Sequence, residues 1–234
     1  MEKINVIKVG GAVVEDQQQL SLLLKEFSAI EGRKVLVHGG GRRATKVASQ
    51  LGIETQMVDG RRITDKAMLE VVTMVYGGLV NKNVVAQLQA EGINALGLTG
   101  ADINVIRSHK RPLKNGIDYG FVGDVDHADG NMLNTNADTI ASEAAKALAP
   151  YYDVTLTFCF EKKGVLANPD DDDSVIPVIT PQLFRKYVAD GTISGGMMPK
   201  IENSLAALNA GVKQVVITKA DTLGSQTGTK ILAE

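Results

Sequence analysis

Two lysines in this sequence stand beside glycine pairs, in positions suited to an anionic group. Lys8 belongs to the apolar segment at residues 4–9 and immediately precedes Gly10 and Gly11. A lysine in a buried strand is costly unless it is paired or functional, whereas on an edge strand it would simply point to water. A cation next to two exposed backbone N–H groups is the outline of a phosphate site. The sequence therefore favours phosphate chemistry at Lys8, with a solvent-facing edge strand as the alternative.

Lys200 provides the second cation. It follows Gly195-Gly196 and falls in the first turn of a predicted helix, where the helix dipole disfavours a cation unless an anion lies opposite. The segment 134–138, Asn-Thr-Asn-Ala-Asp, opens another predicted helix and ends in a carboxylate. Asn and Asp at a helix start are commonly only N-caps, so this segment has a structural interpretation as well as a functional one.

A third glycine cluster, at residues 39–41, follows His38 between a predicted strand and a predicted helix. It is not a Walker A loop, because the pattern G-x-x-x-x-G-K-[ST] occurs nowhere in the chain. It also lacks the third glycine of a dinucleotide-binding loop. Any nucleotide must therefore be bound without either of the two common Gly-rich loops.

The overall composition excludes several classes of function. The chain has 25 Lys+Arg against 27 Asp+Glu, a near balance that argues against a nucleic-acid partner. No apolar run approaches the roughly 20 residues needed to span a bilayer, so no membrane partner is expected. The single Cys159 excludes an internal disulfide, and three widely spaced His argue against a His-based metal cluster. These observations together predict a cytoplasmic protein.

Apolar periodicity and turn residues predict the elements that position these clusters. Strands are expected at 4–9, 34–38, 93–98, 153–160 and 214–218, with an edge strand at 229–232. Helices are expected at 16–30, 43–51, 137–149, 180–189 and 196–210, and a longer one up to residue 91 with Thr64 as its N-cap. Asn115-Gly116 predicts a hairpin turn. Strands and helices that alternate around Gly-rich turns predict an α/β fold, a three-layer αβα sandwich with a mainly parallel central sheet. Ala149-Pro150 suggests a boundary between two lobes near residue 150.

The clusters occur in an order that resembles the amino-acid kinase family and, within it, the N-acetylglutamate kinases. The matching strings are KVGG at 8–11, HGGG at 38–41, DGRRIT at 59–64, NTNAD at 134–138, GGMMPK at 195–200 and TGTKI at 227–231. One such string would be weak evidence, but the ordered set covers nearly the whole chain. The resemblance implies the amino-acid kinase fold, with residues 1–150 as an acylglutamate-binding and dimerisation lobe and residues 151–234 as a nucleotide-binding lobe.

The resemblance also implies an activity, which is transfer of a phosphoryl group from ATP to the side-chain carboxylate of N-acetyl-L-glutamate in arginine biosynthesis. Mg²⁺ would be held mainly by the nucleotide phosphates, with no metal ligand from the protein. The chemistry agrees with general principles, because a carboxylate nucleophile is already ionised at neutral pH and needs no general base. The difficulty is to bring two anions together, which cations and aimed N–H groups overcome.

Residue roles follow from the same resemblance. Lys8 and Lys200 would stabilise the charge on the transferring phosphoryl group, and Asp138 would orient both lysines, so these three are the expected catalytic residues. The expected substrate-binding residues are Gly40, Gly41, Arg62 and Asn134. The expected nucleotide-binding residues are Gly10, Gly11, Gly164, Thr192, Ile193 and Ser194.

The chain departs from the family pattern at three places. Lys162 and Lys163 precede Gly164 and would either contact phosphates or be solvated, and the acidic run at 170–173 is expected to be a solvated loop. Gly195 stands where the family often has an Asp. Near Val125–His127 the chain lacks a helix and a strand, so we hypothesise that roughly 20–25 residues are missing there. A normally bonded chain at this junction would refute that hypothesis.

Several alternatives stay open at this stage. Carbamate kinase, glutamate 5-kinase and UMP kinase share parts of the pattern, and the acyl group could be succinyl rather than acetyl. The chain could instead be a non-catalytic nucleotide or anion sensor, or a general small-molecule-binding α/β protein with a site at the strand ends. The short segment before Lys8 leaves no room for the extra N-terminal helix of hexameric relatives, so the resemblance implies a homodimer without arginine feedback.

Overall fold

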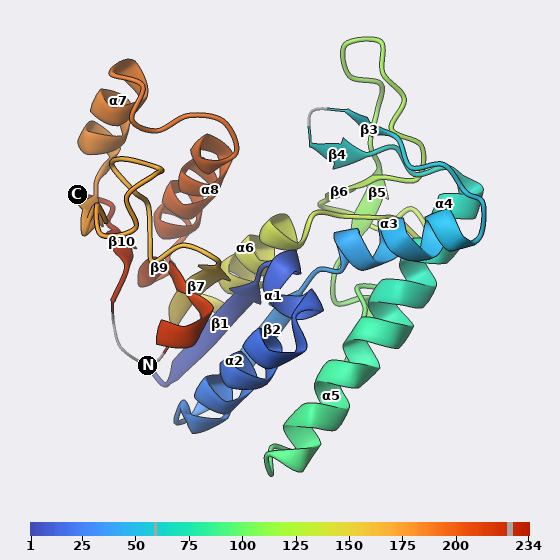
Figure 1. The fold of residues 1–234 in the computed structure, drawn as a ribbon, viewed down its shortest axis with the longest axis horizontal. Helices are drawn as coiled ribbons and strands as arrows, with labels where there is room; N and C mark the ends of the chain where they lie inside the picture. The colour runs from blue at the N-terminus through green and yellow to red at the C-terminus, as the bar shows by residue number, and fades with distance from the viewer. Residues whose placement is uncertain (59, 224–226) are drawn as a thin grey trace. The chain divides into compact units, whose positions relative to one another are not determined.

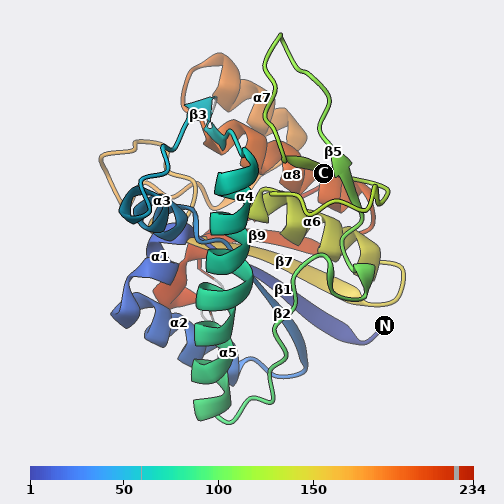
Figure 2. The same cartoon turned by 90° about the vertical axis from the view of Figure 1, so that its right-hand side faces the viewer.

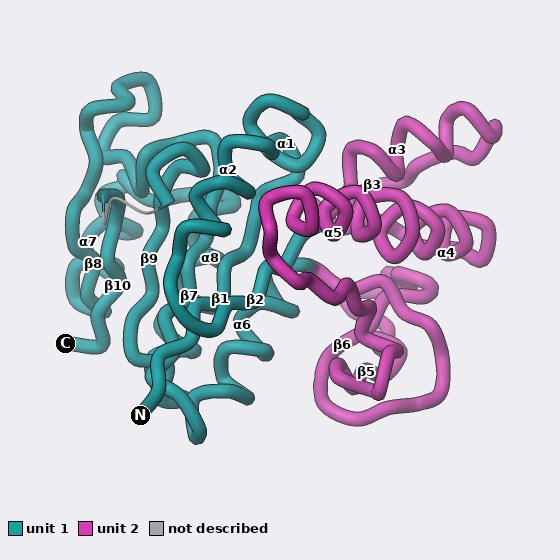
Figure 3. The backbone as a smooth tube through the Cα atoms, turned by 90° about the horizontal axis from the view of Figure 1, so that it is seen from below, with its two compact units in different colours: residues 1–38, 137–234 teal, residues 39–136 magenta. Residues whose placement is uncertain are grey.

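The computed structural model describes residues 1–58, 60–223 and 227–234. The packing of the chain divides it into two compact units, shown in two colours in Figure 3. Unit 1 contains residues 1–38 and 137–234, and unit 2 contains residues 39–136. This division differs from the expected boundary near residue 150, because the helix that begins at Ala137 packs on the central strands of unit 1.

The sheet of unit 1 is mainly parallel, as predicted (Figure 1). Its strands lie in the order β2 (Arg33–His38), β1 (Lys3–Val9), β7 (Asp153–Phe160), β9 (Gln214–Lys219), β10 (Thr229–Ile231) and β8 (Val178–Ile179). The first four run parallel, and β10 is antiparallel to β9. The prediction that 229–232 forms an edge strand is wrong, because β10 is hydrogen-bonded on one side to β9 and on the other to β8.

Helices cover both faces of this sheet and complete the predicted sandwich (Figure 2). One face carries α1 (Gly11–Glu15), α2 (Gln17–Ala29) and the 3₁₀ turn η3 (Ala220–Thr222), and the other carries α6 (Ala137–Leu148), α7 (Pro181–Ala189) and α8 (Met197–Asn209). The α2 helix confirms the helix that apolar spacing predicted at residues 16–30. Leu20, Leu23, Leu24 and Phe27 are all buried, and the Asp16 side chain caps the helix by accepting from two backbone N–H groups.

Lys8 lies on an interior strand of the sheet. The β1 strand pairs with β2 on one side over Ile4–Val9 and with β7 on the other side over Lys3–Val9. Val6, Ile7 and Val9 around Lys8 are buried in the core. The edge-strand interpretation of Lys8 is therefore wrong, and the cost of placing an ammonium group there must be offset by a partner.

Unit 2 is built mainly of helices and two small sheets. It contains α3 (Gly41–Gln50), β3 (Met57–Val58), β4 (Arg61–Arg62), α4 (Lys66–Thr73), the π-helix η1 (Met74–Val80), α5 (Asn81–Ala90), the 3₁₀ turn η2 (Asp102–Asn104), β5 (Ser108–Lys110) and β6 (Gly123–Val125). The predicted long helix is confirmed as α4, η1 and α5 in succession, but its N-cap is Asp65, whose carboxylate accepts from the Met68 N–H at 2.7 Å. Thr64 is instead fully buried, and its hydroxyl donates to the Arg62 carbonyl. No helix among the described residues of either unit is long and apolar enough to cross a membrane.

The strand predicted at 93–98 does not form. These residues are irregular, and none of them pairs with another strand among the described residues. Leu96 is 81% exposed and Leu98 is 41% exposed, although both were expected to pack in a sheet. A strand gains its stability from a hydrogen-bonded neighbour, so an apolar segment without one stays open.

The hairpin predicted at Asn115-Gly116 is confirmed. Both residues have positive φ, 52° and 76°, which the tight turn of a two-residue hairpin requires. Beyond the hairpin, the N–H of Asp126, directly after β6, donates to the Arg107 carbonyl at 3.1 Å. The hypothesis that roughly 20–25 residues are missing near Val125–His127 stays a prediction.

Candidate active site

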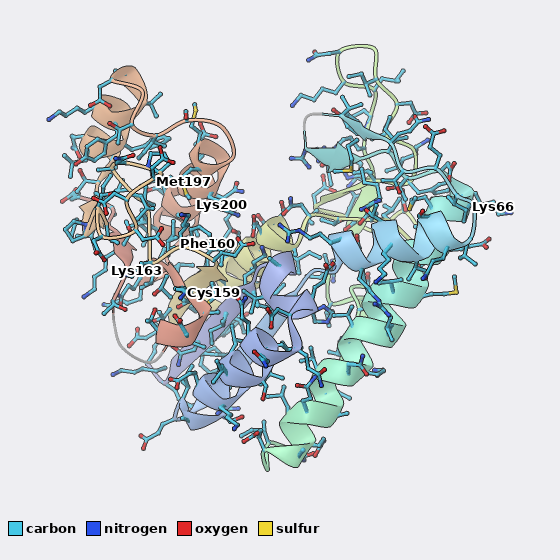
Figure 4. The ribbon with its side chains drawn as sticks, viewed as in Figure 1. Lys66, Cys159, Phe160, Lys163, Met197 and Lys200 are labelled. Atoms are coloured by element: carbon cyan, nitrogen blue, oxygen red, sulfur yellow. The ribbon has the colours of Figure 1, made fainter. Side chains whose placement is uncertain are left out.

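Unit 1 brings Lys8, Asp138 and Lys200 together at one carboxylate. The Lys8 Nζ lies 2.8 Å from Oδ1 of Asp138, and the Lys200 Nζ lies 2.7 Å from Oδ2 of the same side chain. Each side chain is at most about a quarter exposed. The three residues come from β1, α6 and α8, and Figure 4 labels Lys200 among the side chains of α8. The two cations, distant in sequence, therefore share one anion.

The environment of Asp138 keeps its carboxylate ionised. Burial raises its pKa, but the charges of Lys8 and Lys200 and their hydrogen bonds outweigh burial and hold the pKa below the usual value. Asp138 also lies in the first turn of α6, where the helix dipole favours a negative charge. Two ammonium groups on one carboxylate leave a net positive charge, which suits a phosphoryl group.

Gly10 and Gly11 follow Lys8 but differ in their surroundings. The Gly10 N–H donates to the Cys159 carbonyl at 2.8 Å, so it extends the pairing of β1 with β7 and is not available to a phosphate. A Cβ at Gly10 would lie 3.3 Å from that carbonyl oxygen. Gly11 opens α1, where N–H groups have no acceptor within the helix, and a Cβ there would meet no atom within 4 Å. The hydrogen bond to Cys159 therefore contradicts the expectation that the Gly10 N–H binds a phosphate, whereas the Gly11 N–H stays a candidate for that contact.

The other predicted nucleotide residues of unit 1 occupy two loops. Gly164 is buried, and a Cβ there would lie 2.8 Å from the Thr229 hydroxyl, so close packing alone explains this glycine. Thr192, Ile193 and Ser194 connect α7 to α8. The Ile193 side chain belongs to the core and its N–H donates to the Tyr187 carbonyl. Ser194 is exposed, so it is the more accessible residue of this loop.

Lys162 and Lys163 have partners that the sequence did not indicate. Lys162 pairs with Asp172 at 2.7 Å and Lys163 pairs with Asp173 at 2.5 Å, so the basic pair lies against the acidic run at 170–173. All four side chains are largely exposed, as expected for a solvated loop. Exposed ion pairs of this kind contribute little to stability, and they satisfy both lysines without a phosphate.

Unit 2 contains a buried cation of a different kind. Arg62 is 8% exposed, and its guanidinium donates to the Gly41 carbonyl at 2.8 Å and to the Thr45 hydroxyl at 2.9 Å. It also donates to the Thr55 hydroxyl at 3.2 Å. All of these acceptors are neutral, and among the described residues no carboxylate lies within ion-pair distance of Arg62. A buried guanidinium without a carboxylate partner is suited to receive an anionic ligand.

Asn134 is joined to Arg62 through Thr64. The Asn134 amide donates to the Thr64 hydroxyl at 3.0 Å, and that hydroxyl donates to the Arg62 carbonyl at 3.2 Å. The Asn134 backbone pairs beside Val122, which fixes its position. Sequence reasoning missed Thr64 as a connecting residue, although it ends the DGRRIT string. Asp59, which opens that string, lies outside the described residues.

Gly40 and Gly41 stand at the start of α3, directly after the chain enters unit 2. A Cβ at Gly40 would lie 3.0 Å from the Tyr76 ring, so this glycine permits close packing of α3 on the π-helix. At Gly41 a Cβ would lie 3.8 Å from the Arg62 guanidinium. Burial raises the pKa of Tyr76 and the charge of Arg62 opposes that rise. The four residues predicted to bind substrate, Gly40, Gly41, Arg62 and Asn134, all belong to unit 2.

The chain is similar to known proteins along nearly its whole length. Residues 3–219 match the sequence pattern described as "Amino acid kinase family". Over 254 aligned residues the chain is 61% identical to "Acetylglutamate kinase" of Bacteroides thetaiotaomicron, covering 98% of each chain. The protein of the same name from Cytophaga hutchinsonii is 49% identical over 100% of both chains. Among solved structures, smu.665 from Streptococcus mutans is 30% identical with a TM-score of 0.79, covering 99% of each chain.

This chain belongs to the amino acid kinase family. Its fold is the one that the family implies. The alignment with the Bacteroides thetaiotaomicron protein spans 254 positions, whereas the chain has 234 residues, so at least 20 of those positions have no counterpart here. A difference of this size agrees with the hypothesis that roughly 20–25 residues are missing near Val125–His127.

Proposed function

We propose that this protein transfers the γ-phosphoryl group of ATP to the side-chain carboxylate of N-acetyl-L-glutamate, as a step of arginine biosynthesis. The observation that carries the proposal is the pair of ammonium groups held on the two oxygens of Asp138. The relatives named acetylglutamate kinase, at 49–61% identity over nearly the whole chain, support the same substrate.

The reaction breaks the bond between the γ-phosphorus and the oxygen that bridges to the β-phosphate. A carboxylate oxygen of the substrate forms the new bond to phosphorus, so the products are an acyl phosphate and ADP. No proton has to be removed, because the carboxylate is already ionised. Lys8 and Lys200 neutralise the charge spread over the phosphoryl oxygens, and Asp138 acts as a positioning residue that fixes both ammonium groups.

Unit 2 supplies the residues for the substrate. Arg62 is buried among neutral acceptors, so an incoming α-carboxylate can bind its guanidinium as a charge-assisted pair. The Asn134 amide donates to the Thr64 hydroxyl, which in turn donates to the Arg62 carbonyl. Gly40 and Gly41 open α3, and the Gly41 backbone lies close to the Arg62 guanidinium. These residues form the acylglutamate-binding part of the proposed mechanism.

Unit 1 supplies the residues for the nucleotide. Gly11 and the loop that contains Thr192 and Ser194 are the candidates for phosphate and nucleotide contacts. Both oxygens of Asp138 already accept an ammonium group, so this carboxylate is poorly suited as a ligand for Mg²⁺. A bound Mg²⁺ would therefore be held by the nucleotide phosphates, where it neutralises charge on the leaving group. We also propose a cytoplasmic homodimer, in keeping with the family resemblance.

A trapping assay with hydroxylamine tests the proposal, since acyl phosphates form hydroxamates. N-acetyl-L-glutamate with MgATP should give hydroxamate, whereas free glutamate should give almost none. N-succinyl-L-glutamate should react at least about tenfold more slowly in kcat/KM, because an acyl group that does not fit loses transition-state binding. Faster reaction with the succinyl substrate would contradict the acetyl assignment but leave the kinase class intact. ATP binding without any product from either acylglutamate would support the alternative of a nucleotide sensor.

A further inference from the structure

Tyr76 places a hydroxyl group beside the buried guanidinium of Arg62. A Cβ built on Gly41 would lie 3.8 Å from Nη2 of Arg62 and 3.9 Å from the Tyr76 hydroxyl oxygen. Apart from the adjoining backbone of α3, no other atom of the described residues lies within 4 Å of that position. Two polar groups, one of them charged, therefore face the same open position over Gly41.

The packing of unit 2 holds the Tyr76 ring in this place. Tyr76 is a half-buried residue of the π-helix η1, which follows α4 and packs on α3. A Cβ at Gly40 would lie 3.0 Å from the Tyr76 ring and 3.3 Å from the Val80 side chain, so only a glycine lets the ring come this close to the start of α3. Short π-helical segments are frequent at functional sites. The ring is therefore fixed, and its hydroxyl lies beside the first turn of α3.

Arg62 already uses most of its N–H groups within the protein. A guanidinium has five N–H donors, and the two terminal nitrogens of Arg62 make four hydrogen bonds. The acceptors are the Gly41 carbonyl, the Thr45 and Thr55 hydroxyls and, more weakly, the Met68 sulfur. Arg62 thus offers an incoming carboxylate its full charge but few free N–H groups. Because a carboxylate can accept about four hydrogen bonds, a second donor beside Arg62 would strengthen its binding.

The Tyr76 hydroxyl has the properties of such a donor. Burial raises the pKa of Tyr76, and it outweighs the charge of Arg62 and the hydrogen bond with its side chain, which act in the opposite direction. The hydroxyl therefore keeps its proton at neutral pH. A phenol oxygen that accepts from a guanidinium still has its own O–H to donate, so Tyr76 can bind Arg62 and an anion at the same time.

We propose that the Tyr76 hydroxyl is a second donor to the α-carboxylate of the acylglutamate, which lies over Gly41 between this hydroxyl and the Arg62 guanidinium. The inference rests on the proposed function, because it concerns the same substrate. The guanidinium supplies the opposite charge, and the hydroxyl supplies a directed hydrogen bond. Tyr76 is then a specificity-determining residue, because an analogue without the α-carboxylate leaves both buried groups without their partner.

Calorimetric titration of N-acetyl-L-glutamate into the full chain, without nucleotide, tests the proposal. Tyr76→Phe removes the hydroxyl but keeps the ring against Gly40, so the melting temperature should not change. Binding should weaken by about tenfold, as expected for loss of a hydrogen bond to a charged group. 4-Acetamidobutyrate has the acyl group and the side-chain carboxylate but no α-carboxylate. Its affinity, measured by displacement of N-acetyl-L-glutamate, should be the same in wild type and Tyr76→Phe. Tyr151→Phe, which removes an exposed hydroxyl of unit 1, is the matched control and should change neither affinity.

Two further variants separate a direct contact from an indirect effect. Gly41→Ala puts a methyl group into the open position at ordinary contact distance, so the chain should fold, while N-acetyl-L-glutamate should bind about tenfold more weakly because the methyl group crowds the carboxylate. In an Arg62→Gln background, Tyr76→Phe should still weaken binding. No additional loss there would make Tyr76 a positioning residue for Arg62 and overturn the direct contact.

The remaining outcomes distinguish this inference from the proposed function. Equal affinity of wild type and Tyr76→Phe for N-acetyl-L-glutamate, an equal loss for 4-acetamidobutyrate, or full affinity in Gly41→Ala would overturn the role of Tyr76 and leave the kinase reaction intact. A chain that binds N-acetyl-L-glutamate through Tyr76 but forms no hydroxamate would contradict the proposed function alone. A wild-type chain that does not bind N-acetyl-L-glutamate would overturn both.

Discussion

The two units hold their partly or fully buried cations in opposite ways. In unit 1, Lys8 and Lys200 share the carboxylate of Asp138, so their charges are partly compensated within the protein. In unit 2, Arg62 donates only to neutral oxygens and to the Met68 sulfur, among the described residues. A carboxylate fixes the direction of a cation, whereas neutral acceptors leave its charge uncompensated.

This difference matches two different tasks. A group that stabilises a transition state must be held in place before the reaction, because reorganisation during the reaction would cost free energy. A group that binds a carboxylate gains most when no protein anion competes for it. We therefore expect substitutions in unit 1 to act mainly on kcat and substitutions at Arg62 to act mainly on KM.

The largest effect should come from loss of a lysine in unit 1. Lys8→Ala or Lys200→Ala should lower kcat on the order of 10²–10³, comparable to the loss of one oxyanion donor, with a smaller change in the KM for acylglutamate. Steady-state kinetics with the hydroxamate assay measure both constants. Lys25→Ala, an exposed lysine on α2, is the matched control and should change neither. Unchanged turnover in Lys8→Ala would remove the catalytic assignment of that residue.

The sequence predicted most of the local elements of unit 1 but fewer of unit 2. Strands such as β1 and β7 are strongly apolar and end at clear turn residues, so their pattern alone identified them. The segment 93–98 has the same kind of pattern but no strand beside it among the described residues, and a local pattern cannot reveal whether a partner exists. The same limitation explains why β10 was predicted to be an edge strand. Its second neighbour, β8, is only two residues long and was not predicted.

The contacts of the candidate site were predicted only in part. The family resemblance implied that Asp138 orients Lys8 and Lys200, and the structure places both ammonium groups on that carboxylate. The hydrogen bond from the Gly10 N–H to Cys159 depends on the register of β1 against β7, which no sequence motif records.

The second largest effect should come from Arg62. Arg62→Gln should raise the KM for N-acetylglutamate by about 10–100-fold, because a hydrogen bond to a charged group contributes about 1.5–3 kcal/mol. The change in kcat should be smaller than in the lysine variants. The neighbouring Arg61 is exposed, so Arg61→Gln is the matched control. A fall in kcat with unchanged KM would contradict the division of tasks between the two units.

A smaller effect concerns stability and pH. The pKa of Asp138 is lowered in the folded state, so this carboxylate stabilises the fold above its unfolded pKa near 3.8, and the stabilisation disappears as the pH falls through the folded value. Asp138→Asn should therefore cost about 1–2 kcal/mol at pH 7, and the difference from wild type should shrink below about pH 4. Urea unfolding at several pH values measures it. Asp170→Asn in the exposed acidic loop should show no such dependence.

The smallest effect should separate the two glycines that follow Lys8. Gly10→Ala places a methyl group 3.3 Å from the Cys159 carbonyl and should reduce stability by roughly 1 kcal/mol, the lower end of the cost of overpacking. Gly11→Ala meets no atom within 4 Å and lies in α1, so it should leave stability unchanged or slightly higher. If a phosphate of ATP approaches the Gly11 N–H, only Gly11→Ala should raise the KM for ATP without loss of stability. Thermal unfolding with ATP-dependent kinetics on both variants decides this, and an unchanged KM in Gly11→Ala would restrict the phosphate contacts of unit 1 to the two lysines and the α7–α8 loop.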